Sequence, residues 1–355
     1  MIDAELTIRP VEEDDEAAFI AAGKSAFDPI TGMGMATGDV NLAAILDGEV
    51  VGGFIAALHE SSRGEMMGVV RWLFVTEGAR GVGVGGQLVE AGLQAIRDAG
   101  ARWIFSDILG ENTSSAGLVV AAGGRQFSLA QQVRAVGVMG TFRVWSELGH
   151  WYDLGYFIHG WADEEANQPP AAYRSGELWL SSLFCVIVAS LAAWRAGHAV
   201  IWVTAAALLL LITREVVIRG LARAQGLSLR HAAWDSSVPI AVALAAGLGI
   251  YFPIVGGLYP RDGEWKARKE RRRRGVAALG AAAAIAGWGV VAWWAVQTQV
   301  WPGAEAVLFI AVPMLLFGAI LATPPFSAFD ASRLREWSLP AWVVAAGVGV
   351  VFLFL

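Results

Sequence analysis

The sequence has little cysteine, little lysine and, across its second half, few charged residues. Its single cysteine, Cys185, lies inside an apolar run, which excludes an internal disulfide and a thiolate metal cluster. Only three of the 26 basic residues are lysines. Residues 1–10 carry Asp3 and Glu5 and no apolar core, so we expect neither a signal peptide nor an opening anchor there, and an N-terminal domain that stays in the cytoplasm.

Charge and hydropathy divide the chain into two parts. Residues 1–170 hold 23 acidic and 10 basic residues, whereas residues 171–355 hold 9 acidic and 16 basic ones. A hydrophobic content of 56% and a mean hydropathy of +0.52 exceed what soluble proteins show. The composition therefore predicts an acidic, water-soluble domain followed by a membrane domain whose basic residues lie in loops.

The order of strand and helix patterns in residues 1–165 predicts a mixed α/β domain with a mostly antiparallel sheet. Asp47-Gly48 separates two apolar runs, which is the pattern of a β-hairpin. Strands are expected at 6–9, 43–46, 50–58, 69–75 and 102–108, and helices at 12–27, 85–99 and 114–122. We expect residues 126–138 and 145–161 to continue the sheet.

A polar linker at 166–175 leads into residues 176–355, which we expect to form an all-α polytopic transmembrane domain in a lipid bilayer. Apolar stretches lie at 177–194, 199–213, 237–258, 276–298, 303–322 and 338–355. Six crossings would place the basic run at 266–274 outside. A re-entrant hairpin at 237–258 with five spans keeps that run cytoplasmic. The run lacks interleaved aromatic residues, so we expect no nucleic acid partner.

A glycine-rich segment follows the strand 69–75 and opens the helix 85–99. It reads Arg80-Gly81-Val82-Gly83-Val84-Gly85-Gly86-Gln87. Glycines let consecutive backbone amides approach an anion, and a helix N-terminus adds partial positive charge, so the pattern suits a pyrophosphate. Residues 81–86 also fit a dinucleotide-binding G-x-G-x-x-G, which spacing alone does not exclude, but the preceding hairpin is unlike a β-α-β repeat.

The same segment resembles the GCN5-related N-acetyltransferase (GNAT) family, whose acetyl-CoA loop reads Arg/Gln-x-x-Gly-x-Gly/Ala and is matched by Arg80, Gly83 and Gly85. Asn112 with Ala116, and Gly124 with Phe127, are similar to a second family motif. The resemblance implies that acetyl-CoA binds at 82–87, at Asn112, and at the backbone of three strand residues, Leu73, Phe74 and Val75.

Direct attack of a primary amine on the thioester requires a base and a source of protons for the thiolate. Glu60 and Glu65 are the candidate bases, although each could equally be a solvated loop residue. The family's usual acid is a tyrosine in the helix after Asn112, but residues 112–130 contain none. Tyr152, in a tail at 149–153 similar to the family's closing strand, and water are the remaining candidates for the acid.

No cluster of residues has metal-ligand spacing, so we expect no metal, and we interpret His59 and His150 as structural. In the second half, the sequence around Arg214 and Glu215 and the segment 324–330 faintly resemble site-2 intramembrane metalloproteases. Arg214 and Ile218 replace both histidine ligands of that family, which implies an inactive relative in which Arg214 and Glu215 pair with each other or reach the interface.

Two functions follow as expectations. The first is a membrane-anchored N-acetyltransferase that acts on a small molecule, an amino acid or a protein. The second is a non-catalytic acyl-CoA sensor or assembly protein whose membrane half engages a membrane-protein partner. An acetyltransferase whose acceptor is itself embedded in the membrane is a variant of the first.

Overall fold

The computed structural model describes residues 6–27, 29–163, 176–253, 256–260, 267–322 and 328–354. The predicted linker at 166–175, residue 266 of the basic run and residues 324–327 lie outside these ranges. The described chain packs into two compact units. The first contains residues 1–108, 114–150 and 157–172, and the second contains residues 173–355 together with the short segments 109–113 and 151–156.

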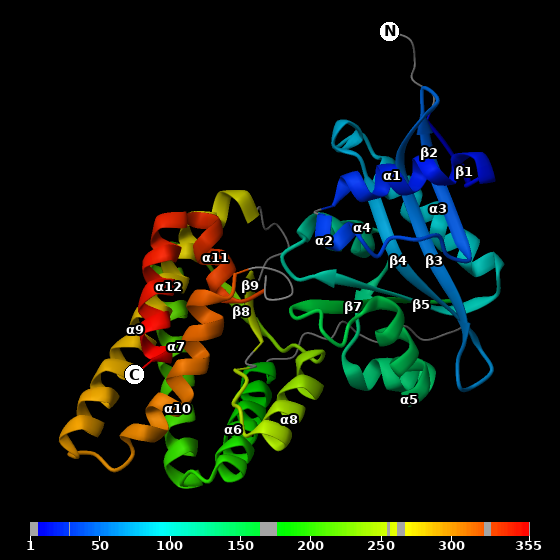
Figure 1. Cartoon of the computed structure of the whole chain (residues 1–355). Helices are drawn as coiled ribbons and strands as arrows, with labels where there is room; N and C mark the ends of the chain where they lie inside the picture. The colour runs from blue at the N-terminus through cyan, green and yellow to red at the C-terminus, as the bar shows by residue number, and fades with distance from the viewer. Residues whose placement is uncertain are drawn as a thin grey trace. The chain divides into compact units, whose positions relative to one another are not determined.

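The first unit is built on a seven-stranded sheet in the order β1-β2-β3-β4-β5-β7-β6 (Figure 1). The strands are β1 Leu6–Pro10, β2 Val40–Leu46, β3 Glu49–Glu60, β4 Met66–Val75, β5 Ala101–Leu109, β6 Arg125–Gln126 and β7 Tyr156–Ala162. Strands β1 to β4 pair antiparallel, and β4 pairs parallel with β5. The predicted mixed, mostly antiparallel sheet at this end of the chain is confirmed.

The turn of the hairpin formed by β2 and β3 lies at the two residues where the sequence pattern predicts it. Asp47 and Gly48 both adopt positive φ, 51° and 85°. Two central residues with positive φ match the right-handed twist of the flanking strands, which is why an Asp-Gly pair favours this turn.

Helices cover both faces of the sheet (Figure 1). They are α1 Glu16–Ala26, α2 Pro29–Gly32, α3 Val84–Asp98, α4 Thr113–Ala121 and α5 Leu129–Leu148, with short 3₁₀ turns at Glu13–Asp15 and Glu77–Ala79. Alternate side chains of β3 lie on the two faces of the sheet, because successive strand side chains point in opposite directions. Phe54 packs with Leu88 of α3, whereas the next residue, Ile55, packs with Phe19 of α1.

The prediction that residues 126–138 and 145–161 continue the sheet is wrong over most of their length. Only Arg125–Gln126 and Tyr156–Ala162 are strands, and α5 occupies the chain between them. Ser128 and Gln131 form a capping box that starts this helix, and Gly149 ends it in the left-handed conformation. The residues predicted as a closing strand at 149–153 therefore form the helix end and a turn.

The second unit is helical, with one small sheet. Its elements are α6 Glu177–Ala196, α7 Val200–Ala224, α8 Ser237–Leu248, α9 Ala267–Thr298, α10 Ala304–Leu315, the π-helix η3 Leu316–Ile320, α11 Asp330–Trp337, α12 Leu339–Leu353, and the paired strands β8 Leu229–Ala232 and β9 Gly257–Pro260. The paired strands were not predicted.

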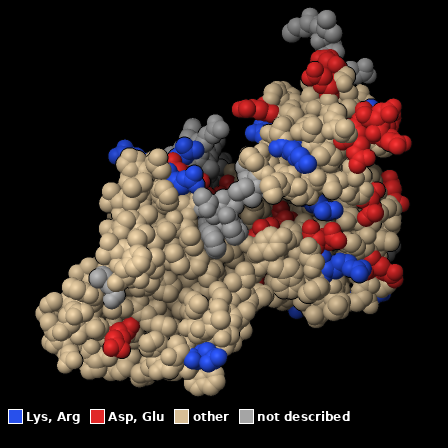
Figure 2. All heavy atoms as spheres, in the orientation of Figure 1, with Lys and Arg blue, Asp and Glu red and all other residues tan. Residues whose placement is uncertain are grey.

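Among the described residues, three helices are long and apolar enough to cross a membrane: Glu177–Ala196, Val200–Ala224 and Glu270–Thr298. Three other apolar helices are shorter, and α8 has 12 residues. At 1.5 Å per residue α8 spans about 18 Å, less than a bilayer core. Figure 2 shows few charged side chains over the face of the second unit that it presents.

Candidate functional site

A left-handed glycine turn joins the end of β4 to the start of α3. Gly81 and Gly83 have φ of 89° and 92°, and Gly83 is the residue that precedes the first turn of α3. A Cβ built at either glycine would meet no atom within 4 Å. The backbone conformation, rather than crowding, therefore requires glycine here, and the turn keeps open space beside it.

The turn exposes backbone amides at the N-terminus of α3. The Gln87 amide donates to the Gly83 carbonyl at 3.3 Å, whereas helix geometry leaves the amides of Val84, Gly85 and Gly86 without carbonyl partners inside the helix. The Val84 side chain is buried and anchors the turn, and the Val82 side chain is exposed. This is the arrangement that stabilises an anion at a helix N-terminus.

Arg80 holds the turn in place through its own side chain. Its Nε donates to the Val75 carbonyl at 3.1 Å, and its Nη2 donates to the Ala26 carbonyl at 3.4 Å. These bonds connect the end of β4, the end of α1 and the glycine turn. Arg80 therefore acts on the predicted binding loop by fixing its backbone.

The sheet opens into a fork between β4 and β5. Within the described chain, their pairing runs from Met66 opposite Ala101 to Val69 opposite Phe105 and stops there. Two residues further along β4, Arg71 is the extra residue of a β-bulge, because Ile55 and Ala56 of β3 pair with Trp72 and Val70. A bulge bends a strand and re-aims a side chain. The second half of β4 thus diverges from β5.

The predicted strand residues lie in this diverging half of β4. Leu73, Phe74 and Val75 pair on one edge with β3. A strand presents backbone groups along both edges, so the edge facing β5 supplies donors and acceptors inside the fork. The fork leads from the bulge toward the glycine turn that follows Val75.

The predicted acids occupy the other end of these strands. Glu65 precedes the first β4–β5 pair, and its Oε1 accepts from Arg102 Nη1 at 2.6 Å. Glu60 ends β3 opposite Met66. Both therefore lie at the closed end of the fork.

Two further predicted residues lie in the short segments that belong to the second unit. Asn112 directly precedes α4, and its amide donates to the Leu109 carbonyl at 2.7 Å. Tyr152 lies in the turn after α5 and is 59% exposed. Their assigned roles, as an acetyl-CoA contact and as an acid, stay predictions.

The structure also shows a cluster of polar side chains near the fork that the sequence did not predict. Glu147, near the end of α5, lies with Oε1 at 3.0 Å from His59 Nε2 and with Oε2 at 3.9 Å from Arg71 Nε. On β5, Asp107 Oδ2 lies 3.6 Å from Nδ1 of the fully buried His150. Both histidines thus face carboxylates from other elements. No local motif identifies this cluster, because its members come from β3, β4, β5, α5 and the turn that follows α5.

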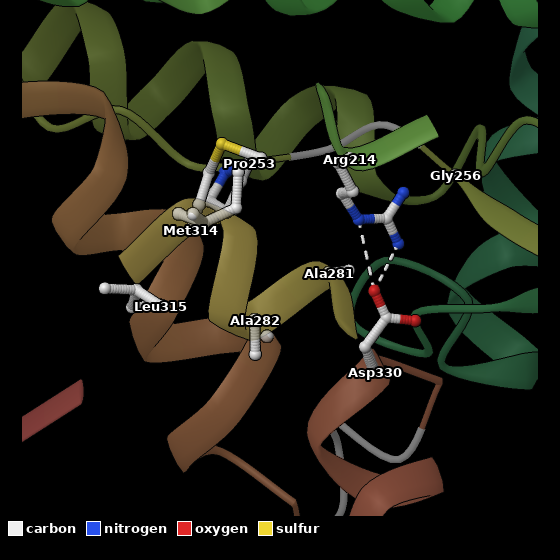
Figure 3. Close-up of a pocket in the computed structure, with 10 residues that line it drawn as sticks. Arg214, Pro253, Gly256, Ala281, Ala282, Met314, Leu315 and Asp330 are labelled. Atoms are coloured by element: carbon white, nitrogen blue, oxygen red, sulfur yellow. Dashed lines mark hydrogen bonds and ion pairs between the residues drawn. The ribbon is translucent and has the colours of Figure 1, made fainter. Parts of the chain in front are cut away.

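A second site of interest is a pocket in the helical unit (Figure 3). Small and apolar residues of α9, α10 and η3 line most of it, and Arg214 and Asp330 meet at its edge. Arg214 donates to Asp330 Oδ2 through Nη2 at 2.5 Å and through Nε at 3.1 Å. Its Nη1 pairs with Glu215 at 3.1 Å, which confirms the predicted pairing of these neighbours.

Other ions complete the network around that pocket. Glu215 also pairs with Arg219 at 3.0 Å, and Asp330 with Arg333 at 2.9 Å. Arg333 and Arg274 both pair with Glu111, which lies in one of the segments that belong to this unit. Among the described residues, no group of three or more His, Cys, Asp or Glu side chains could hold a metal ion.

One known family model matches most of the sheet of the first unit. Residues 10–123 match the model described as the acetyltransferase (GNAT) family, and they include the hairpin, the fork and the glycine turn. No curated protein matches the chain. The family match therefore supports a GNAT-type acetyltransferase domain at residues 10–123, followed by a helical region.

Three solved structures to which this chain is similar are distant in sequence. Arabidopsis thaliana Naa50 in complex with a bisubstrate analogue is 13% identical with a TM-score of 0.33, covering 44% of this chain and 98% of its own. A GNAT family acetyltransferase from Brucella melitensis in complex with acetyl-CoA is 18% identical with a TM-score of 0.31, covering 48% and 97%. A phosphinothricin N-acetyltransferase homologue is 20% identical with a TM-score of 0.32, covering 44% and 98%.

Proposed function

We propose that this GNAT-type domain binds acetyl-CoA and transfers its acetyl group to a primary amine by direct attack, and that the helical unit anchors the enzyme in a membrane. The observation that carries the proposal is the glycine turn of Gly81 and Gly83, which joins the open half of β4 to the N-terminus of α3. One continuous path thus offers strand edges and then an anion cradle, as an extended thioester with a pyrophosphate requires.

In this proposal each end of acetyl-CoA has its own partners. The amides of residues 82–87 hold the pyrophosphate. The β4 backbone at Leu73, Phe74 and Val75 holds the pantetheine arm, which brings the thioester toward the bulge at Arg71. Arg80 keeps the turn in the binding conformation. Asn112 is assigned to the same site on the family resemblance alone.

The acid that protonates the departing thiolate is not a tyrosine of α4. Val119 is buried there and Val120 is exposed, at the positions where the family resemblance would place the hydroxyl. Water or Tyr152 serves instead, since a thiolate is a good leaving group that needs little assistance. The acceptor is a small molecule, an amino acid or a protein.

Membrane anchoring draws its support from the three long apolar helices and from the face of the second unit seen in Figure 2, which bears few charges. A helix of about 20 apolar residues spans the hydrocarbon core. We propose five spans and a re-entrant hairpin at 237–258, or six spans, with the N-terminal unit in the cytoplasm. In the re-entrant topology, the short α8 is one arm of the hairpin.

The missing tyrosine favours a second candidate, a non-catalytic acyl-CoA sensor whose membrane half engages a membrane-protein partner. That half resembles an inactive site-2 protease, and the Arg214 guanidinium already pairs with both Glu215 and Asp330. An arginine in that place supplies a permanent positive charge without any metal chemistry. The sensor binds acetyl-CoA as the enzyme does and differs only in lacking turnover.

The two candidates separate in one assay on the full-length protein in detergent micelles. Acetyl-CoA is added with a panel of primary amines and amino acids, and release of the free CoA thiol is followed with a thiol reagent. Thiol release that depends on the amine establishes the transferase. Binding of acetyl-CoA without amine-dependent release identifies the sensor, and the absence of binding contradicts both.

A further inference from the structure

The cluster of His59, Arg71 and Glu147 lies on the face of the sheet opposite α3. Ile55, which lies four residues before His59 on β3, packs against α1. Phe54 and Leu58 pack on the α3 side of the sheet. Since strand side chains alternate, His59 shares the face of Ile55, and Glu60 points to the other face. The cluster therefore approaches the fork from the side that α3 leaves free.

The cluster also lies near the place where the fork opens. His59 pairs with Met67, which is two residues before the last β4–β5 pair at Val69. Two strand residues correspond to about 7 Å. Arg71 is the bulged residue just beyond that pair, and the two oxygens of Glu147 reach toward both side chains. The carboxylate thus bridges β3 and β4 close to the residue where the fork opens.

Helix α5 is fixed over this face by contacts with the β3–β4 turn. Arg63 Nη1 donates to the Arg134 carbonyl at 2.9 Å, and Arg143 Nη1 donates to the Glu60 carbonyl at 3.5 Å. These bonds hold Glu147 against β3 and β4. The cluster nevertheless remains accessible, since the side chains of His59 and Glu147 are 20% and 28% exposed.

His59 Nε2 is a buried atom for which the described structure provides a close carboxylate but no well-aligned hydrogen bond. A buried polar atom in that condition requires an explanation, and a catalytic role is one of the recognised ones. A carboxylate beside one ring nitrogen favours the proton at that nitrogen and leaves the other as a proton acceptor. This is how a carboxylate orients an imidazole base.

We propose that His59 is the general base of the acetyl transfer and that Glu147 and the bulged Arg71 are its positioning residues. The inference rests on the proposed function and deepens it. The imidazole takes one proton from the ammonium group of the acceptor. The freed lone pair forms the N–C bond while the C–S bond breaks, and the electron pair leaves with sulfur. Water or Tyr152 protonates that thiolate and takes up the second nitrogen proton in exchange, and the imidazolium returns its proton to water.

Glu65 is held by Arg102 at the closed end of the fork, and Glu60 points to the opposite face. In this proposal His59, on the face of the sheet opposite α3, is the side chain that serves the thioester, rather than either acid. The acceptor that fits this base is an amine that is protonated at neutral pH, such as an alkylamine or the α-amino group of an amino acid.

The test compares two nucleophiles on the full-length protein in detergent micelles. Alkylamines are protonated at neutral pH and need a base, whereas hydroxylamine is not and needs none. We expect His59→Gln to lower kcat/KM for alkylamines by ~10²–10⁴-fold and to leave the hydroxylamine rate close to that of the wild type. Glu147→Gln should produce a smaller loss of the same kind. Glu90→Gln, an exposed change on α3, is the control for both rates.

Acetyl-CoA binding, measured by calorimetry on the same variants, should be unchanged in His59→Gln. Equal loss with both nucleophiles would assign His59 a structural role and overturn the proposal. An unchanged alkylamine rate would overturn it too, most directly if Glu60→Gln or Glu65→Gln loses that rate instead. A wild-type protein that binds acetyl-CoA but acetylates neither nucleophile contradicts the base and the transferase together, whereas one that does not bind contradicts the proposed function itself.

Discussion

Single residues set the charge balance of the helical unit. The side chains of Arg214 and Asp330 are 14% and 6% exposed, and each has a second ionic partner, Glu215 and Arg333 respectively. Buried ions are costly unless they are paired, so removing one partner leaves the other uncompensated. If both Arg214 and Asp330 are replaced, Glu215 remains paired with Arg219, and Arg333 remains paired with Glu111.

We therefore predict that Asp330→Leu destabilises the protein by about 3–5 kcal/mol, and that the double variant Arg214→Met with Asp330→Leu recovers more than half of the loss. Thermal unfolding in detergent, followed by calorimetry, measures both. Equal destabilisation in the single and double variants would show that the pair contributes through packing and not through charge.

At the scale of elements, α3 connects the core of the first unit to the glycine turn. Leu88 is fully buried among residues of the sheet, and it lies one turn after Gly85. A smaller side chain there leaves a cavity and loosens the helix that carries the anion cradle.

Leu88→Ala should lower the stability of the first unit by about 2–5 kcal/mol and weaken acetyl-CoA binding below the wild-type affinity. Glu90→Ala, on the exposed side of the same helix, should change neither. Chemical unfolding and calorimetry of the two variants side by side provide the measurement. Wild-type stability in Leu88→Ala would contradict the packing described for α3.

Local signals in the sequence predicted the elements that depend on local chemistry. The Asp47-Gly48 turn and the glycine segment before α3 follow from backbone conformations that few residues adopt. The sequence pattern predicts strand over much of the chain that forms helix α5, whereas the capping box of Ser128 and Gln131 identifies a helix start there. The cluster of His59, Arg71 and Glu147 could not be predicted, because it depends on a bulge and on a helix that folds back over β3.

At the scale of the whole molecule, the proposal places the two units in different solvents. The single cysteine, Cys185, is buried in α6, so a Cys185→Ala background permits cysteines to be introduced elsewhere as reporters. Glu90 lies on the exposed side of α3, and His198 lies between α6 and α7.

We predict that a membrane-impermeant thiol reagent applied to intact cells labels His198→Cys and does not label Glu90→Cys, and that both are labelled after lysis. This outcome follows if the first unit is cytoplasmic and α6 crosses the membrane. Labelling of Glu90→Cys in intact cells would contradict the cytoplasmic placement. Recovery of the protein in the soluble fraction after alkaline extraction would contradict the anchoring itself.

The central claim is that the glycine turn before α3 binds acetyl-CoA, and calorimetry tests it most directly. Gly83 and Gly100 stand at opposite ends of α3 with φ of 92° and 86°, and a Cβ at either meets no atom within 4 Å. Valine at either position therefore introduces similar backbone strain, about 1–2 kcal/mol, but only one of the two turns belongs to the proposed cradle.

The measurement is titration of acetyl-CoA into full-length wild-type protein, Gly83→Val and Gly100→Val in detergent micelles. The account predicts that the wild type and Gly100→Val bind with similar affinity, and that Gly83→Val binds at least ~10-fold more weakly, which corresponds to about 1.4 kcal/mol. Equal binding by all three proteins, or none by the wild type, would contradict the assignment of the turn as the acetyl-CoA site.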